Sequence, residues 1–143
     1  VYLPQFRDAV FAYNETMSQS GWAAPQCHVK PLGFQFENTW QSGSHEASAR
    51  AVAEGRADIA SLDALSWDFV KRYERYSLDL RVVEWTKPTP GLPYITSTSL
   101  PADVVFDAVS QAIEALPLAD RITLRLKGIV RIPKSAYLAV PNP

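Results

Sequence analysis

The first part of the sequence alternates short apolar segments with polar segments that favour helices, and no other feature constrains the fold as strongly. The apolar segments have the length of buried strands, and Ser, Asp and Gly residues at their boundaries favour helix caps and turns. The expected strands are residues 9–13, 34–40, 57–63 and 80–85, and the expected helices are residues 18–24, 44–54 and 64–76. Because strands that alternate with helices form layered structures, the pattern predicts an α/β fold with a mostly parallel sheet flanked by helices.

Two of the expected helices carry an apolar stripe, which predicts the face that each helix buries. The stripe is Leu65, Phe69, Tyr73 and Tyr76 in the helix at 64–76, and Val105, Ala108, Val109, Ala112, Ile113 and Leu116 in a helix at 100–116. Between these helices, residues 86–93 hold three prolines and a glycine and predict a crossing segment or hinge. The sequence therefore predicts two parts, residues 1–85 and residues 86–143. The remaining expected elements are a strand at 94–97, a helix near 119–126 and a helical turn near Tyr137.

The charge balance and the scarcity of reactive side chains exclude several classes of protein. The net charge is −1, from 14 basic and 15 acidic residues, whereas a general nucleic-acid binder usually carries a basic excess. One cysteine, Cys27, and two histidines, His28 and His45, predict no disulfide, no metal site and no cofactor. No apolar segment approaches the roughly 18 residues of a membrane span, and the first residues do not resemble a signal peptide. A chain that begins with Val rather than Met is expected to be processed or to be part of a longer protein.

Three loops follow expected strands and open expected helices. They are Ser18-Gln19-Ser20-Gly21, Ser42-Gly43-Ser44-His45 and Leu62-Asp63. In open α/β sheets ligands bind at this edge, and helix starts present unpaired N–H groups that favour an anion. Serine hydroxyls add donors, Gly21 lets the backbone approach closely, and His45 adds a donor that is positively charged when protonated. The sequence therefore predicts an anion site built from Ser18, Gln19, Ser20, Gly21 and His45.

Asp63 does not suit a site for a simple anion, because a carboxylate repels a phosphate. It suits a zwitterionic ligand that has an amine beside its anionic end, or it holds His45 in one tautomer. The alternative is that the serines and Asp63 only cap helices. Two aromatic residues, Trp67 one turn beyond Asp63 and Tyr94, are candidate walls of the ligand pocket, although core packing is the simpler role for each.

An enzyme is the second hypothesis, because Ser20, His45 and Asp63 are the residue types of a nucleophile, a base and an orienting acid. The sequence lacks the Gly-x-Ser-x-Gly turn of many hydrolases, and each of these residues also serves as a ligand donor or acceptor. We therefore expect a binding protein and no enzyme. A structural domain in which all the loop residues are caps is the third hypothesis.

Residues 3–137 resemble the phosphate and phosphonate solute-binding proteins of ABC transporters. The blocks that carry the resemblance are Tyr13-Asn14, Ser18-Gln19-Ser20-Gly21, Gly43-Ser44-His45, residues 51–64 and residues 88–95. The resemblance implies the type II periplasmic-binding-protein fold, in which two α/β lobes joined by crossing strands hold a ligand in their cleft. It also implies a periplasmic or extracellular location, a permease partner and a phosphorus oxyanion as ligand. By resemblance, Ser18–Gly21 cradle the anion, His45 donates to it, and Asp63 meets the amine or another donor of the ligand.

The chain departs from that family in one respect, because the family members begin with a first lobe that precedes the segment matching residues 3–14. By resemblance, residues 1–85 form the second lobe, and residues 86–143 return to complete the first. The apolar stripe of the helix at 100–116 would then lie exposed, which predicts a homodimer through residues 100–143. A sensor domain of the same fold, which signals to a regulator, is the alternative to a transport protein.

Overall fold

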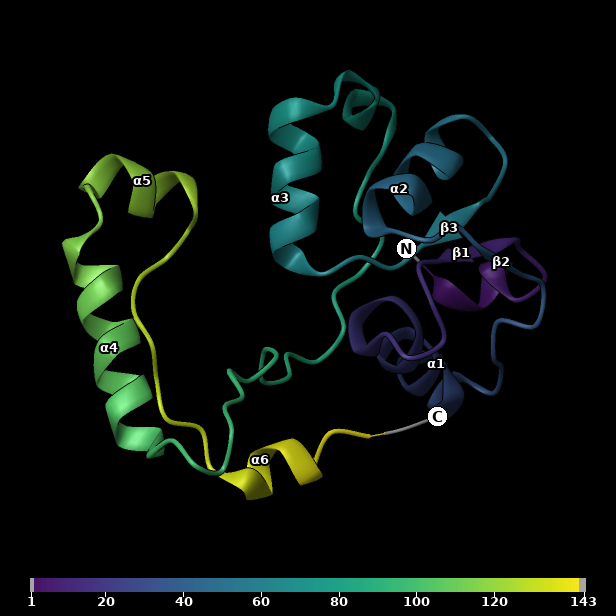
Figure 1. Ribbon diagram of the computed structural model, residues 1–143. Helices are drawn as coiled ribbons and strands as arrows, with labels where there is room; N and C mark the ends of the chain where they lie inside the picture. The colour runs from purple at the N-terminus through teal and green to yellow at the C-terminus, as the bar shows by residue number, and fades with distance from the viewer. Residues whose placement is uncertain (1, 142–143) are drawn as a thin grey trace. The chain divides into compact units, whose positions relative to one another are not determined.

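Figure 1 shows the computed structural model of the chain, which describes residues 2–141. The chain forms two compact units, one that reaches to Pro88 and includes Val140 and Pro141, and one formed by Thr89–Ala139. Val1, Asn142 and Pro143, which belong to the predicted parts 1–85 and 86–143, lie outside the described residues. The assignment of the two predicted parts to lobes of a larger protein stays a prediction.

The first unit is built on a small parallel sheet of three strands. The strands are β1 (Phe11–Tyr13), β2 (Thr39–Gln41) and β3 (Ile59–Ala60), in the order β2-β1-β3. Phe11 of the central strand pairs with Thr39 on one side and with Ile59 on the other. Helices flank this sheet, so the predicted α/β class is confirmed, although each strand is shorter than its sequence segment.

Helices connect the strands and cover the sheet. The first unit holds η1 (Leu3–Phe6), the π-helical turn η2 (Gln19–Ala23), α1 (Ala24–Val29), η3 (Lys30–Leu32), α2 (His45–Ala53), α3 (Ala64–Tyr73) and η4 (Arg75–Asp79). Ala49 and Ala51 of α2 are buried, and these small side chains let the helix lie close to β1 and β3. Ser44 caps α2 as expected, and Gly55 follows its end with a φ of +70°, a conformation that favours glycine.

Aromatic side chains form the centre of the core in the first unit. Phe11 and Phe36 are stacked with ring centroids 4.5 Å apart, and Phe34 meets Phe36 edge-on at 5.5 Å. Leu3, Tyr13 and Val29 complete this cluster of buried side chains. Because Phe11 lies on the central strand, burial of these rings fixes the sheet against α1 and orients the loop that follows β1.

The segment expected as a strand at 34–40 enters the sheet only at its end. Before β2, Phe34 and Phe36 alternate into the core as the pattern predicts, but no strand pairs with them in the described residues. Instead the buried side chain of Gln26 donates through Nε2 to Phe36 O at 3.0 Å and accepts from Phe36 N through Oε1 at 3.0 Å. A side-chain amide thus replaces a neighbouring strand at this point.

Three other expectations are wrong. The segments 80–85 and 94–97 form no strand, since no backbone ladder joins either to another strand in the described part of the chain. The stripe expected on α3 is not its buried face, because Leu65 is 43% and Tyr73 is 66% exposed, whereas Val70 is buried. The helix ends at Tyr73, and the extended Glu74 turns the chain, so Tyr76 belongs to η4 and not to the stripe.

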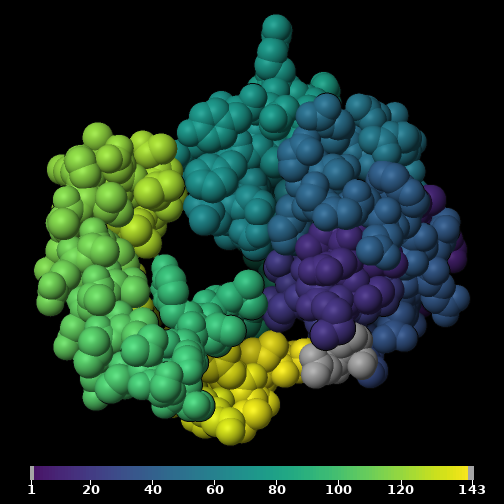
Figure 2. Space-filling model, viewed as in Figure 1, coloured from purple at the N-terminus to yellow at the C-terminus, as the bar shows by residue number. Residues whose placement is uncertain are grey.

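The second unit consists of α4 (Ala102–Ala115), α5 (Leu118–Thr123) and α6 (Lys134–Leu138), which confirms the expected helices within a few residues. After α5 the chain returns alongside α4, coloured yellow-green in Figure 1. There Arg131 Nη2 lies 2.8 Å from Asp103 Oδ1, and its guanidinium lies 4.1 Å from the centroid of the Phe106 ring. α4 and α5 are coloured green in Figure 2, and the side chains of Val104, near the start of α4, and of Leu118 and Ile122, in α5, are exposed. Among residues 2–141, no helix combines the length and the apolar character needed to cross a bilayer.

Candidate functional site

The three loops predicted to form the site meet at the carboxyl edge of the sheet. Ser20 Oγ, after β1, lies 3.0 Å from His45 Nε2, after β2. The same His45 Nε2 lies 3.4 Å from Asp63 Oδ2, after β3. In addition, Ser61 Oγ donates to Ser20 O at 2.7 Å and ties the end of β3 to the loop after β1. Parallel strands bring these side chains together, since their carboxyl ends share one edge.

The loop after β1 folds into a tight turn around Gly21. Ser18 caps η2, and its Oγ accepts from Gly21 N at 3.0 Å, so this hydroxyl oxygen already has a partner within the loop. The backbone of Gly21 packs against Asn14 and His45, and an added Cβ would overlap Asn14 Oδ1 and lie 3.1 Å from His45 Cε1. Only glycine therefore lets this loop approach the imidazole so closely.

The loop after β2 is fixed to the sheet by Ser42. The backbone N of Ser42 donates to Tyr13 O at 2.8 Å, and its Oγ lies 2.6 Å from Ser48 Oγ, a fully buried side chain of α2. Ser44 then caps α2 by accepting from Ala47 N at 3.0 Å. These bonds hold the first turn of α2 in place, and His45, whose side chain is 14% exposed, projects from that turn toward Ser20.

Asp63 serves as the N-cap of α3 and also faces His45. Its Oδ1 accepts from Ser66 N at 2.8 Å, and its Oδ2 accepts from Ser66 Oγ at 2.6 Å. Burial acts to raise the pKa of the Asp63 carboxyl, but the hydrogen bonds from Ser66 and the charge of a protonated His45 hold the pKa below its ordinary value. Asp63 is therefore ionised at neutral pH.

Unpaired polar atoms gather at this edge of the sheet. Over residues 2–141, four buried side-chain polar atoms have no hydrogen-bond partner, and three of them are Asn14 Oδ1, Gln19 Nε2 and His45 Nδ1. Buried polar groups are normally paired, and exceptions call for an explanation such as strain or a functional role. This edge of the sheet therefore contains buried polar atoms that helix capping does not use.

The arrangement of Ser20, His45 and Asp63 differs from that of a hydrolase triad. In a triad, one ring nitrogen of the histidine faces the nucleophile and the other faces the acid. Here His45 Nε2 faces both Ser20 Oγ and Asp63 Oδ2, and Nδ1 has no partner. The geometry suits a cluster of donors around a ligand better than a proton relay. Within the described residues, no group of three His, Cys, Asp or Glu side chains is arranged to hold a metal ion.

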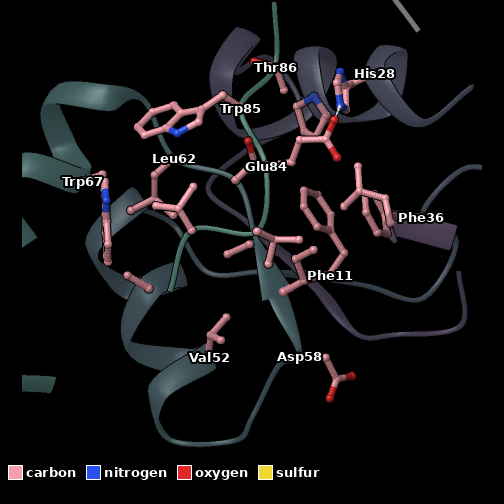
Figure 3. A pocket seen from close by; sticks show the side chains of 18 of the residues that line it. Phe11, His28, Phe36, Val52, Asp58, Leu62, Trp67, Glu84, Trp85 and Thr86 are labelled. Carbon is pink, nitrogen blue, oxygen red and sulfur yellow. Dashed lines mark hydrogen bonds and ion pairs between the residues drawn. The ribbon is translucent and has the colours of Figure 1, made fainter. Parts of the chain in front are cut away.

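The two aromatic residues predicted as pocket walls belong to different units of the chain. Trp67 lines an apolar cavity of about 200 Å³ together with Leu62 and the segment 80–86 (Figure 3). At one side of that cavity His28 Nε2 lies 3.3 Å from Glu84 Oε1. Tyr94 belongs to the second unit, and its side chain is 70% exposed. A role for either residue in the anion site stays a prediction.

Sequence reasoning missed three residues that shape the site. Asn14 packs against Gly21, Ser61 bonds to the backbone of Ser20, and Ser66 holds the Asp63 carboxylate. Asn14 and Ser61 could have been found by listing every polar residue at the carboxyl end of an expected strand. Ser66 shows no such signal, because serine is common in the first turn of helices.

The chain is similar to a known family of proteins over most of its length. Residues 3–130 match the model of the family described as ABC transporter, phosphonate, periplasmic substrate-binding protein. The match includes all three loops at the carboxyl edge of the sheet and extends through α4 and α5. No curated protein matches the chain.

Proposed function

The chain belongs to the family of periplasmic substrate-binding proteins of phosphonate ABC transporters, and on that basis we propose that it binds a small phosphorus oxyanion at the carboxyl edge of its sheet. The observation that carries the proposal is the 3.0 Å contact between Ser20 Oγ and His45 Nε2, which joins donors from two separate loops. Both groups can donate to one anion when it replaces their mutual contact. A hydrogen bond to a charged group contributes about 1.5–3 kcal/mol, so a few such donors are enough for useful affinity.

In the proposed complex, the loop Ser18–Gly21 and the first turn of α2 surround the phosphonate, phosphate or phosphite oxygens. Helix starts favour the negative charge, and Gly21 keeps the backbone close. Asp63 lies next to His45 with its side chain 41% exposed, so its carboxylate can still accept from an amine on the ligand. The ligand is bound without covalent change, by closure of two lobes, and is passed to the permease of the transporter.

An amide NMR titration of the chain with phosphate, methylphosphonate, 2-aminoethylphosphonate and sulfate tests this proposal. We expect saturable shifts at Ser20, Gly21 and His45 with dissociation constants of roughly 1 mM or lower. Phosphate and the phosphonates should bind more tightly than sulfate, and the amino compound should bind most tightly. Asp63→Asn keeps a capping side chain and removes the charge, so this variant should lose only the preference for the amino compound. An absence of shifts at the three residues with every ligand would contradict the proposed site.

We also propose that residues 100–143 mediate self-association of the chain. The stripe expected on α4 is not its exposed surface, because Ile113 is buried and Val105, Val109 and Leu116 are half-buried. Instead Val104, near the start of α4, and Leu118 and Ile122, in α5, are 61%, 64% and 59% exposed, and exposed apolar surface is a common feature of protein–protein contacts. Light scattering at increasing protein concentration should give a mass that rises toward that of a dimer. Ile122→Glu should shift the equilibrium to the monomer, and a wild-type chain that stays monomeric at high concentration would contradict the proposal.

A further inference from the structure

One acidic side chain belongs to the same helix turn as the proposed anion site. Glu46 follows His45 directly and occupies the first turn of α2. A carboxylate there favours the helix itself, but it opposes a second negative charge at the same helix start. Anion binding at this turn therefore requires that the charge of Glu46 is neutralised or that its carboxylate points away from the anion.

Two side chains hold the Glu46 carboxylate. Arg50, one turn along α2, places Nε 2.9 Å and Nη2 2.7 Å from Glu46 Oε1. The phenol of Tyr76, in η4, donates to the same Oε1 at 3.0 Å. The Arg50 guanidinium also lies 5.4 Å from the centroid of the Tyr76 ring, so the three side chains form one group, here called the Glu46 clamp.

Tyr76 adds a contact that an ordinary helical ion pair lacks. Its hydroxyl lies 3.4 Å from the backbone O of Glu46, so η4 reaches the same turn that carries His45. Burial and the hydrogen bond and charge of Glu46 raise the pKa of Tyr76 to about 12. The phenol therefore remains a proton donor to Glu46 throughout the physiological range of pH.

We propose that Arg50 and Tyr76 are positioning residues for anion binding, which hold the Glu46 carboxylate away from the ligand and neutralise its charge. The inference rests on the proposed function, since it concerns the same site. If Arg50 and Tyr76 only stabilised the fold, substitutions in the Glu46 clamp would change stability, and the affinity for the anion would not follow the charge that each substitution leaves. If they shield the anion, the affinity falls when a substitution leaves a negative charge at this turn and recovers when that charge is also removed.

The test measures binding of methylphosphonate and inorganic phosphate by NMR titration of the full chain. Arg50→Gln removes the cation that pairs with Glu46 and that also lies 3.7 Å from Glu74 Oε2, and it should weaken binding about two- to fivefold, the effect of one uncompensated like charge in a largely aqueous setting. Glu46→Gln should bind as tightly as the wild type or more tightly. The affinity of the double variant E46Q/R50Q should return to within about twofold of the wild-type affinity. The difference in affinity between Arg50→Gln and the wild type should become smaller as salt is added, because salt screens the charge. Tyr76→Phe keeps the charges and should weaken binding less than Arg50→Gln.

A second ion pair, just beyond the C-terminal end of α2, provides a matched control. Arg56 Nη2 lies 2.6 Å from Glu54 Oε2, and the Arg56 guanidinium lies 5.0 Å from the centroid of the Trp40 ring. Arg56→Gln removes the same charge from a similar group and should leave affinity unchanged. Equal effects of Arg50→Gln and Arg56→Gln, or no recovery in the double variant, would overturn the inference alone. A wild-type chain that binds neither ligand would overturn the proposed function and the inference together.

Discussion

Replacement of Gly21 by alanine is expected to weaken anion binding at least tenfold and to lower the free energy of unfolding by about 1–3 kcal/mol, the usual cost of an overpacked site. An alanine Cβ would overlap Asn14 Oδ1 and would lie 3.0 Å from Asn14 Cγ and 3.1 Å from His45 Cε1. The Asn14 side chain, the loop after β1 or the imidazole must then move, and a movement of the loop or of the imidazole separates Ser20 from His45. Chemical denaturation measures the loss of stability, and NMR titration with methylphosphonate measures the loss of affinity.

Two controls separate this clash from a general intolerance of alanine. Gly91 has no heavy atom within 4 Å of a Cβ built on it, so Gly91→Ala should change neither stability nor affinity. Asn14→Ala in the Gly21→Ala background removes the amide that the new methyl group meets, and it should recover part of the lost stability. If Gly21→Ala binds methylphosphonate as tightly as the wild type, the loop does not approach the ligand as we propose.

Replacement of His45 by alanine is expected to weaken binding of methylphosphonate and phosphate by about ten- to a hundredfold, because a hydrogen bond to a charged ligand is lost. His45 Nε2 lies 3.0 Å from Ser20 Oγ and 3.4 Å from Asp63 Oδ2, so its loss also removes the side-chain contact that joins the loop after β2 to the other two loops. His45→Gln keeps an amide donor without a positive charge and should give an intermediate affinity. The same NMR titration measures both variants.

The second histidine of the chain provides the matched control. His28 pairs with Glu84 beside the apolar cavity and does not face Ser20 or Asp63. His28→Ala should therefore leave the affinity for both anions unchanged. Equal losses in His28→Ala and His45→Ala would indicate an effect on folding rather than a ligand contact, and an unchanged affinity in His45→Ala would remove His45 from the site.

The meeting of the three loops could be predicted from the sequence, because it follows from the order of strands and helices alone. Ser20, His45 and Asp63 each follow a strand of one parallel sheet, so they share its carboxyl edge whatever the details of packing. The identity of the contacting atoms could not be predicted. It depends on the register that pairs Phe11 with Thr39 and Ile59, and on the π-helical turn at Gln19–Ala23.

Residues 80–85 and Tyr76 show where sequence reasoning failed. The segment 80–85 has the composition of a strand. A strand forms only where the backbone can pair with the edge of a neighbouring strand, and the composition of a segment does not show whether such an edge lies beside it. Tyr76 continued the apolar spacing of α3, yet the helix ends at Tyr73 without a glycine or proline to mark its end. Its hydroxyl instead contacts Glu46 in α2, a contact that no local pattern indicates.

The position of β1 at the centre of the sheet has a consequence for how the chain folds. The central strand is the first of the three in the sequence, and both partners of Phe11, Thr39 and Ile59, come much later. Both pairings in the sheet are therefore non-local, and each requires closure of a long loop before its ladder bonds form. The hydrogen bonds within each helix are local, so we expect the helices to form before the sheet. We then expect the carboxyl edge with Ser20, His45 and Asp63 to assemble late, so that a step that delays the sheet also delays the appearance of binding.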